Sequence, residues 1–258
     1  MVRVWGVAAL ALLALAGCGG GSGGTTATTG STMSGTAGTS GGGSGSSSSG
    51  TTPTPQTDPA AYFSQIISPG YDSYQAALVG NSHTGATGLP NTAYASMPSS
   101  GTANFNGYAF LIANSGSQVV GQPSIGIEGT ATLSVDFSNN SASGSATNFV
   151  GGPIGALDTT TGKYPLTQAA IAYPGSIAIS NGCVGANHGC SSVTRPNQMQ
   201  ADFSGTLAGG GNTITANGQV LADFKGTPIQ GVAVSGGTIT TKINGNNVPG
   251  AFYFYVKP

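Results

Sequence analysis

Hydrophobic and polar residues alternate with a period of two along much of the second half of the chain. In residues 129–137, Ala131, Leu133 and Val135 fall on one side, and threonine or serine residues stand between them. This alternation is typical of a β-strand with one buried face. The same pattern, or a short apolar run of strand length, recurs in residues 103–112, 143–150, 176–179, 199–207, 214–224, 232–234, 239–243 and 252–256. The pattern therefore predicts a chain built mainly of strands.

Short turn sequences separate most of these strands. Examples are Ser138-Asn139-Asn140, Gly236-Gly237 and Asn244-Gly245, and such turns join antiparallel neighbours. Closure into a barrel removes the unpaired edges that an open sheet would leave. We therefore predict a mainly β fold, a small antiparallel β-barrel of about eight strands over residues 97–258. A sandwich of two sheets is the alternative.

The inward positions of these strands are bulky, so we expect a packed core rather than a ligand cavity inside the barrel. The predicted core residues are Leu133, Val135, Phe137, Phe203, Leu207, Phe224, Ile239, Phe252 and Phe254. Three of the phenylalanines follow an aspartate, in the pairs Asp136-Phe137, Asp202-Phe203 and Asp223-Phe224. We interpret each pair as an inward ring beside an outward, solvated carboxylate.

One short helical segment is predicted ahead of the barrel, within residues 58–96. Asp58 is a suitable N-cap and Pro59 suits the first helical position. Ser68-Pro69-Gly70 is expected to stop this helix, and residues 71–79 to add a second turn or two. We expect the segment to pack on the barrel.

The first residues of the chain have the features of an export signal. Arg3 precedes an apolar run that is too short to span a bilayer, and Leu15-Ala16-Gly17-Cys18 follows it. This box resembles that of bacterial lipoproteins, which implies cleavage after residue 17 and acylation of Cys18. The alternative is an ordinary secretory signal cleaved near Ala16. Residues 18–57 are nearly all Gly, Ser and Thr, so we expect a flexible tether.

Charge and composition exclude several classes of partner. Only 5% of the residues are charged, with six basic and seven acidic side chains, so nucleic-acid binding is disfavoured. The chain holds two histidines, and no nucleophile, base and orienting acid can be assembled around them. We therefore expect a protein that is not an enzyme and that needs no cofactor.

The barrel sequence resembles the C-terminal barrel domain of transferrin-binding protein B-like bacterial surface lipoproteins. Residues 97–108 (MPSSGTANFNGY) are similar to that family's opening strand, and residues 129–137 look like its second strand. Residues 201–207 and 250–253 look like later strands. The resemblance implies an eight-stranded barrel that captures host or partner proteins, with iron or haem acquisition among the roles, at the Gram-negative outer membrane. The chain departs from the family pattern after Tyr253, where a Gly-Pro sequence is expected.

Two further cysteines, Cys183 and Cys190, stand six residues apart in a glycine-rich segment. In an exported protein the simplest interpretation is a local disulfide. The alternative is a metal site that adds His188 to the two thiolates, although a fourth ligand is not evident.

Residues 151–198 form a long insertion between predicted strands, and long loops on a rigid scaffold often carry recognition. We therefore name Tyr164, Tyr173 and His188 as candidate contacts for a protein partner. The functional hypothesis is a lipid-anchored binding module of the cell envelope. The alternative is a structural or assembly lipoprotein without a soluble ligand.

Overall fold

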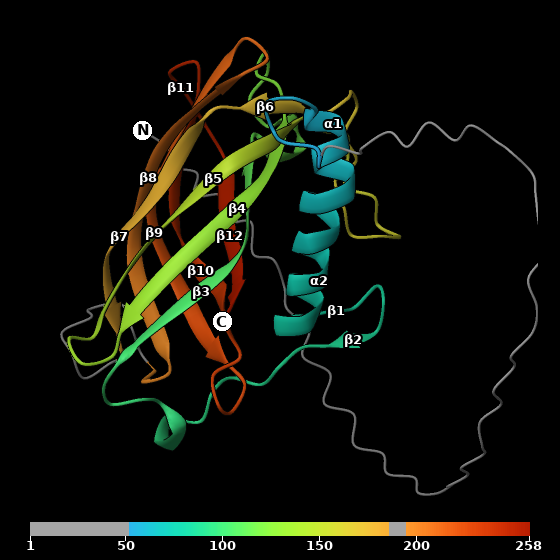
Figure 1. The fold of residues 1–258 in the computed structure, drawn as a ribbon. Helices are drawn as coiled ribbons and strands as arrows, with labels where there is room; N and C mark the ends of the chain where they lie inside the picture. Colours follow the sequence, from blue (N-terminus) through green and yellow to red (C-terminus); the bar gives the residue numbers. More distant parts are fainter. Residues whose placement is uncertain (1–51, 186–194) are drawn as a thin grey trace, which may run out of the picture. The chain divides into compact units, whose positions relative to one another are not determined.

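The structure is a computed structural model, and it describes residues 52–185 and 195–258. These residues form a closed antiparallel barrel of eight strands with one helical segment lying against its outer wall (Figure 1). The eight wall strands are β3 (Thr102–Ala113), β4 (Ile125–Asp136), β5 (Ser141–Pro153), β7 (Gly175–Val184), β8 (Gln198–Gly209), β9 (Asn212–Lys225), β10 (Gly231–Ile243) and β12 (Gly250–Lys257). The predicted fold class is confirmed, and the sandwich alternative is excluded.

Each wall strand pairs with its neighbours in chain order, and β12 closes the barrel between β10 and β3. Its ladder with β3 runs from Gly250↔Ala113 to Lys257↔Asn106, whereas β10 pairs with it only at Val232↔Val256 and Ala233↔Tyr255. Four short strands stand outside this order: β1 (Gly80–Asn81), β2 (Ala86–Thr87), β6 (Ile171–Tyr173) and β11 (Asn246–Val248). The chain thus forms an up-and-down meander.

The period-two pattern explains which side chains fill the barrel. In β4, Leu133 and Val135 are buried in the core while Thr132 faces solvent. Phe203 stacks on Phe252 with ring centroids 4.9 Å apart, and other inward rings join them. The predicted core set is buried except for Ile239, which is only partly buried. The interior is therefore a packed core, as predicted.

Two details of the strands differ from the prediction. Gly236-Gly237 is not a turn, because β10 runs unbroken through it with a bulge between Val234 and Gly236. A bulge adds one residue to one strand, which breaks the side-chain alternation that a sequence pattern relies on. β4 also begins four residues before the predicted start, because the first residues of β4 are buried on both faces and so do not alternate.

The helical segment is continuous where a stop was predicted. It comprises α1 (Pro59–Tyr62), the π-helical turn η1 (Phe63–Ile67) and α2 (Ser68–Leu78). Asp58 caps it as predicted, accepting a hydrogen bond from the Ala61 amide at 3.0 Å. The π-turn ends two residues before Pro69, so the wider turn accommodates a residue without an amide hydrogen. The predicted stop at residues 68–70 is wrong for this reason.

The helical segment covers the outer face of the barrel wall along its length (Figure 1). Tyr71 packs between Phe110 and Tyr255, with ring centroids 5.7 and 5.2 Å apart. Nearer the start, Tyr62 and Ile67 bury Val150 of β5.

None of the helices within residues 52–185 and 195–258 is long and apolar enough to cross a membrane.

The insertion at 151–198 contains more strand than the predicted residues 176–179. It contains the end of β5, the short strand β6 and all of β7. Tyr173 ends β6 and is 1% exposed, within the core of the barrel. An exposed contact at Tyr173 is therefore excluded. Tyr164 lies in the β5–β6 connection and is half-buried.

One of the three predicted Asp-Phe pairs also differs from its interpretation. The Asp223 side chain is buried rather than solvated, and it accepts hydrogen bonds from Gln198 at 2.9 Å and Arg195 at 3.3 Å. These partners lie on β8 and just before it, so the carboxylate ties two adjacent strands together. All three phenylalanines point inward as predicted.

Candidate binding cleft at one end of the barrel

A segment without regular pairing crosses one end of the barrel before β3 begins. We call residues 89–97 the strap. It includes the 3₁₀ turn η2 (Tyr94–Ser96) and a single bridge from Asn91 to Lys225. The strap connects the hairpin of β1 and β2 to the first wall strand (Figure 1).

Hydrogen bonds fix the middle of the strap to β9 and to Asn197, the residue before β8. The Thr92 amide donates to the Phe224 carbonyl at 2.8 Å, and the Asn197 side-chain amide donates to the Thr92 carbonyl at 2.5 Å. Lys225 donates to the Asn91 side chain at 2.7 Å, and burial lowers the pKa of its ammonium group. Thr92 is fully buried. The strap is therefore a fixed part of the barrel end.

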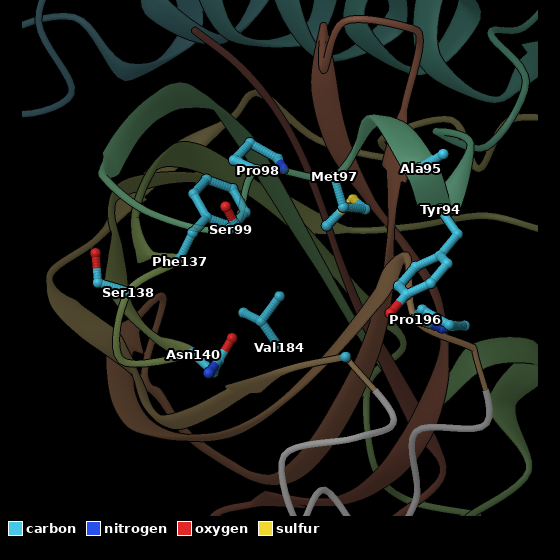
Figure 2. A pocket seen from close by; sticks show the side chains of 11 residues that line it. Tyr94, Ala95, Met97, Pro98, Ser99, Phe137, Ser138, Asn140, Val184 and Pro196 are labelled. Carbon is cyan, nitrogen blue, oxygen red and sulfur yellow. The ribbon is translucent and has the colours of Figure 1, made fainter.

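A cleft of about 490 Å³ lies between the strap and the open ends of β4, β5 and β7 (Figure 2). Its lining among the described residues comprises Tyr94, Ala95, Met97, Pro98, Ser99, Phe137, Ser138, Asn140, Val184, Gly185 and Pro196. These residues come from four separate parts of the chain. Only the closed barrel brings them together.

The floor of the cleft is apolar and belongs to the barrel core. Phe137 and Val184 are buried, and the Phe137 ring packs against Phe224 at 5.8 Å between centroids. Figure 2 shows Met97, Phe137 and Val184 around the cleft, each from a different part of the chain. A ligand would therefore rest on a rigid surface.

The rim combines one exposed aromatic ring with hydroxyl and amide groups. Tyr94 is 61% exposed, the largest value among the aromatic residues of the described chain. Opposite it, Ser138 and Asn140 belong to the β4–β5 turn (Figure 2). This turn is fixed by Asp136, whose carboxylate accepts from the Asn139 side chain at 2.7 Å and the Ser138 amide at 2.8 Å. The Asn139 bonds, with those of Ser138, lower the pKa of Asp136.

The described lining of the cleft contains no charged side chain. Arg195, next to Pro196, is engaged by the buried Asp223. The cleft therefore offers apolar contact and neutral hydrogen-bond groups, which suit an uncharged group with an apolar part.

The structure brings only part of the predicted contact region to this cleft. Val184, Gly185 and Pro196 come from the 151–198 insertion, but Tyr164 and Tyr173 do not line the cleft.

Cys18, His188 and Cys190 lie outside the described residues. Cys183 lies in β7, paired in register with Gln200 of β8. The Cys183–Cys190 disulfide stays a prediction.

The sequence interpretation missed Tyr94, Met97 and Asn140. Asn140 lies in a predicted turn at a strand end, whereas Tyr94 and Met97 lie several residues before the predicted strand at 103–112 and carry no such signal. Within residues 52–185 and 195–258 no group of three or more histidine, cysteine or acidic residues is arranged to hold a metal ion.

Comparison with known proteins gives no relative from which a role could be transferred. No family model, no curated protein and no solved structure matches the chain.

Proposed function

We propose that this protein is a lipid-anchored binding module of the cell envelope, which captures a partner protein at the cleft beside the strap. The observation that supports binding at this place is the pairing of a rigid apolar floor with an exposed aromatic rim. Phe137 and Val184 form the floor, and Tyr94 forms the rim. Aromatic side chains at the edge of a preformed cavity are typical anchors of protein interfaces.

The partner group that fits is an uncharged, apolar protrusion with at least one hydrogen-bonding atom. It would lie on Met97 and Phe137 and bond to Ser99 or Asn140 at the rim. Because the described lining contains no charged side chain, we expect capture to depend little on salt concentration.

The anchor rests on the sequence around Cys18. Acyl chains on that cysteine would hold the protein at a membrane surface, and residues 19–57 would let the barrel reach a partner beyond it. Replacing Cys18 by serine should abolish incorporation of a fatty-acid probe in growing cells. A variant that still takes up the label would contradict the anchor.

The resemblance to transferrin-binding protein B-like lipoproteins supports the same proposal. It favours an outer-membrane location and a host or partner protein as the ligand, with iron or haem acquisition among the possible roles. The structural or assembly role is the competing hypothesis, and it requires no ligand at the cleft.

Affinity capture with the purified full-length protein tests the proposal. Tyr94→Ala should lose the captured partner, because it removes the exposed anchor without disturbing a buried contact. Tyr253→Ala is the matched control, since Tyr253 is another exposed tyrosine that does not line the cleft. Equal capture by both variants would contradict binding at the cleft. A wild-type protein that captures nothing from its host or its own envelope would favour the structural role.

A further inference from the structure

A lysine and an aspartate in contact, and a glutamate that interacts electrostatically with both, lie where the helical segment packs on the barrel, away from the cleft. Lys163 belongs to the β5–β6 connection, Asp72 to α2 and Glu128 to β4. Lys163 is 91 positions from Asp72 in the sequence. Glu128 is 56 positions from Asp72 and 35 from Lys163. The fold alone therefore brings these residues near one another.

The lysine and the aspartate are in direct contact. Lys163 Nζ donates a hydrogen bond to Asp72 Oδ2 and forms an ion pair with it. Both residues are held by their own elements. The backbone of Lys163 closes a turn by accepting from the Asp158 amide at 2.8 Å, and Asp72 lies in the middle of α2. The amine and the carboxyl carbon are therefore positioned for repeated encounter.

Glu128 lies on the outer face of the wall, close enough to both members of the pair to interact with them electrostatically. It stands in register with Phe110 and Val150, next to a bulge in the β4–β5 ladder, and bulges commonly re-aim a side chain. Its Oε2 atom is buried and has no hydrogen-bond partner. The adjoining ring cluster of Tyr71 and Phe110 makes the surroundings apolar.

The charge of Glu128 responds to both members of the pair. Burial, and to a smaller extent the Asp72 carboxylate, raise the pKa of Glu128 to about 8 against the opposing effects of Lys163 and a hydrogen bond with Ser68. At neutral pH the carboxyl group is thus mainly protonated. A neutral carboxylic acid of this kind can both give and take a proton.

We propose that Lys163 and Asp72 become joined by an intramolecular amide bond, with Glu128 as the group that moves the protons. One ammonium proton first passes from Lys163 Nζ to the Asp72 carboxylate, which frees the lone pair of the nitrogen. Nζ then bonds to Asp72 Cγ, and the bond from Cγ to the oxygen that received the proton breaks. Glu128 gives its proton to the departing oxygen and regains one from the nitrogen. Two of the three ammonium protons leave with the oxygen as water, so the reaction needs no oxidant, reductant or further reactant.

The partial exposure of the pair gives the released water a path to solvent. The Lys163 and Asp72 side chains are 51% and 34% exposed, so the released water can leave, whereas Glu128 stays shielded. As an ion pair alone, such an exposed contact contributes little to stability. As an amide, it would fasten the β5–β6 connection permanently to α2.

Mass spectrometry of the full-length protein tests the proposal. After denaturation and chymotryptic digestion, the wild-type protein should give a branched peptide that joins Asp72 to Lys163 and is lighter by about 18 Da, one water, than its two parts. Trypsin should fail to cleave after Lys163. Lys242→Arg is the control, because no carboxylate of the described residues pairs with Lys242, and it should keep the branched peptide.

Two variants separate the amide from the ion pair. Lys163→Arg keeps the positive charge but cannot form the amide, so the branched peptide should be absent. Glu128→Gln keeps the size of the side chain but cannot exchange protons, so the branched peptide should be lost or form at least about 100-fold more slowly. Unbranched peptides with normal cleavage after Lys163 in the wild-type protein would overturn the proposal. Normal bond formation in Glu128→Gln would overturn the role of Glu128.

Discussion

Gly70 of α2 lies directly against the ring of Tyr108 on β3. A Cβ atom added at position 70 would stand 2.1 Å from Tyr108 Cζ, far inside van der Waals contact. The absence of a side chain at this position therefore lets the helical segment approach the barrel wall. Tyr108 in turn packs edge-on against Tyr74, with centroids 5.1 Å apart.

Gly70→Ala should consequently weaken the docking of the helix, even though alanine favours helix formation. We expect a loss of about 1–3 kcal/mol in the free energy of unfolding, the usual cost of overpacking. Chemical denaturation measures it. Gly236→Ala is the control, because a Cβ atom there meets nothing within 4 Å. A Gly70→Ala protein as stable as the parent would show that the helix can shift without cost.

Phe137 and Tyr94 both line the cleft but should respond differently to truncation. Phe137→Ala removes a buried ring that packs on Phe224, so we expect it to cost about 3–5 kcal/mol of stability. Tyr94→Ala removes an exposed ring and should leave the melting temperature almost unchanged. Calorimetry of the two variants tests the division between floor and rim. A large loss of stability in Tyr94→Ala would contradict it.

Glu128 gives the stability of the protein a defined pH dependence. Burial raises its pKa from 4.5 to about 8, so between these values the folded protein holds a proton that the unfolded chain has released. Stability from this group is therefore complete below pH 4.5 and falls as the pH rises through about 8. Amide formation would remove the charges of Asp72 and Lys163 but not the burial, so the direction is the same in either state.

Melting temperatures measured between pH 5 and 9 test this dependence. Glu128→Gln, which is neutral throughout, should show a flatter profile than the parent across this range. A parent protein whose stability rises steadily from pH 5 to 8 would contradict a buried, protonated Glu128.

The two cysteines of the glycine-rich segment give a further prediction. If Cys183 and Cys190 are bonded, the closed loop is short, and its loss should cost at most about 2–3 kcal/mol while the barrel persists. Alkylation of the folded, exported protein should find neither thiol accessible until a reductant is added. Labelling of both thiols without reductant, or zinc retained through purification, would contradict the disulfide.

The wall strands could be predicted because their signal is local. Side chains such as Leu133 and Val135 alternate with threonine and serine, and that alternation is enough to place them inside. The signal fails where tertiary contacts decide. Gly236-Gly237 has the composition of a turn but pairs with β9 inside a bulged strand, and Pro69-Gly70 follows a π-turn instead of ending the helix.

The cleft, and the grouping of Lys163, Asp72 and Glu128, could not be predicted from the sequence for the same reason. The strap is held by Thr92 and Asn197, which are 105 positions apart, and nothing in either neighbourhood indicates the other. For Asp223 the local pattern gave a wrong prediction. The strand alternation predicts a solvated carboxylate, but the side chain is buried and accepts hydrogen bonds from Arg195 and Gln198.

Capture of a partner at the rim of the cleft is the central claim, and site-specific photo-crosslinking in intact cells tests it most directly. A photoreactive amino acid is placed at position 94 of the full-length protein, and at position 253 as the control. We predict a discrete adduct of one partner protein from position 94 and none from position 253. No adduct from position 94, or the same adducts from both positions, would contradict the claim that the cleft is the binding site.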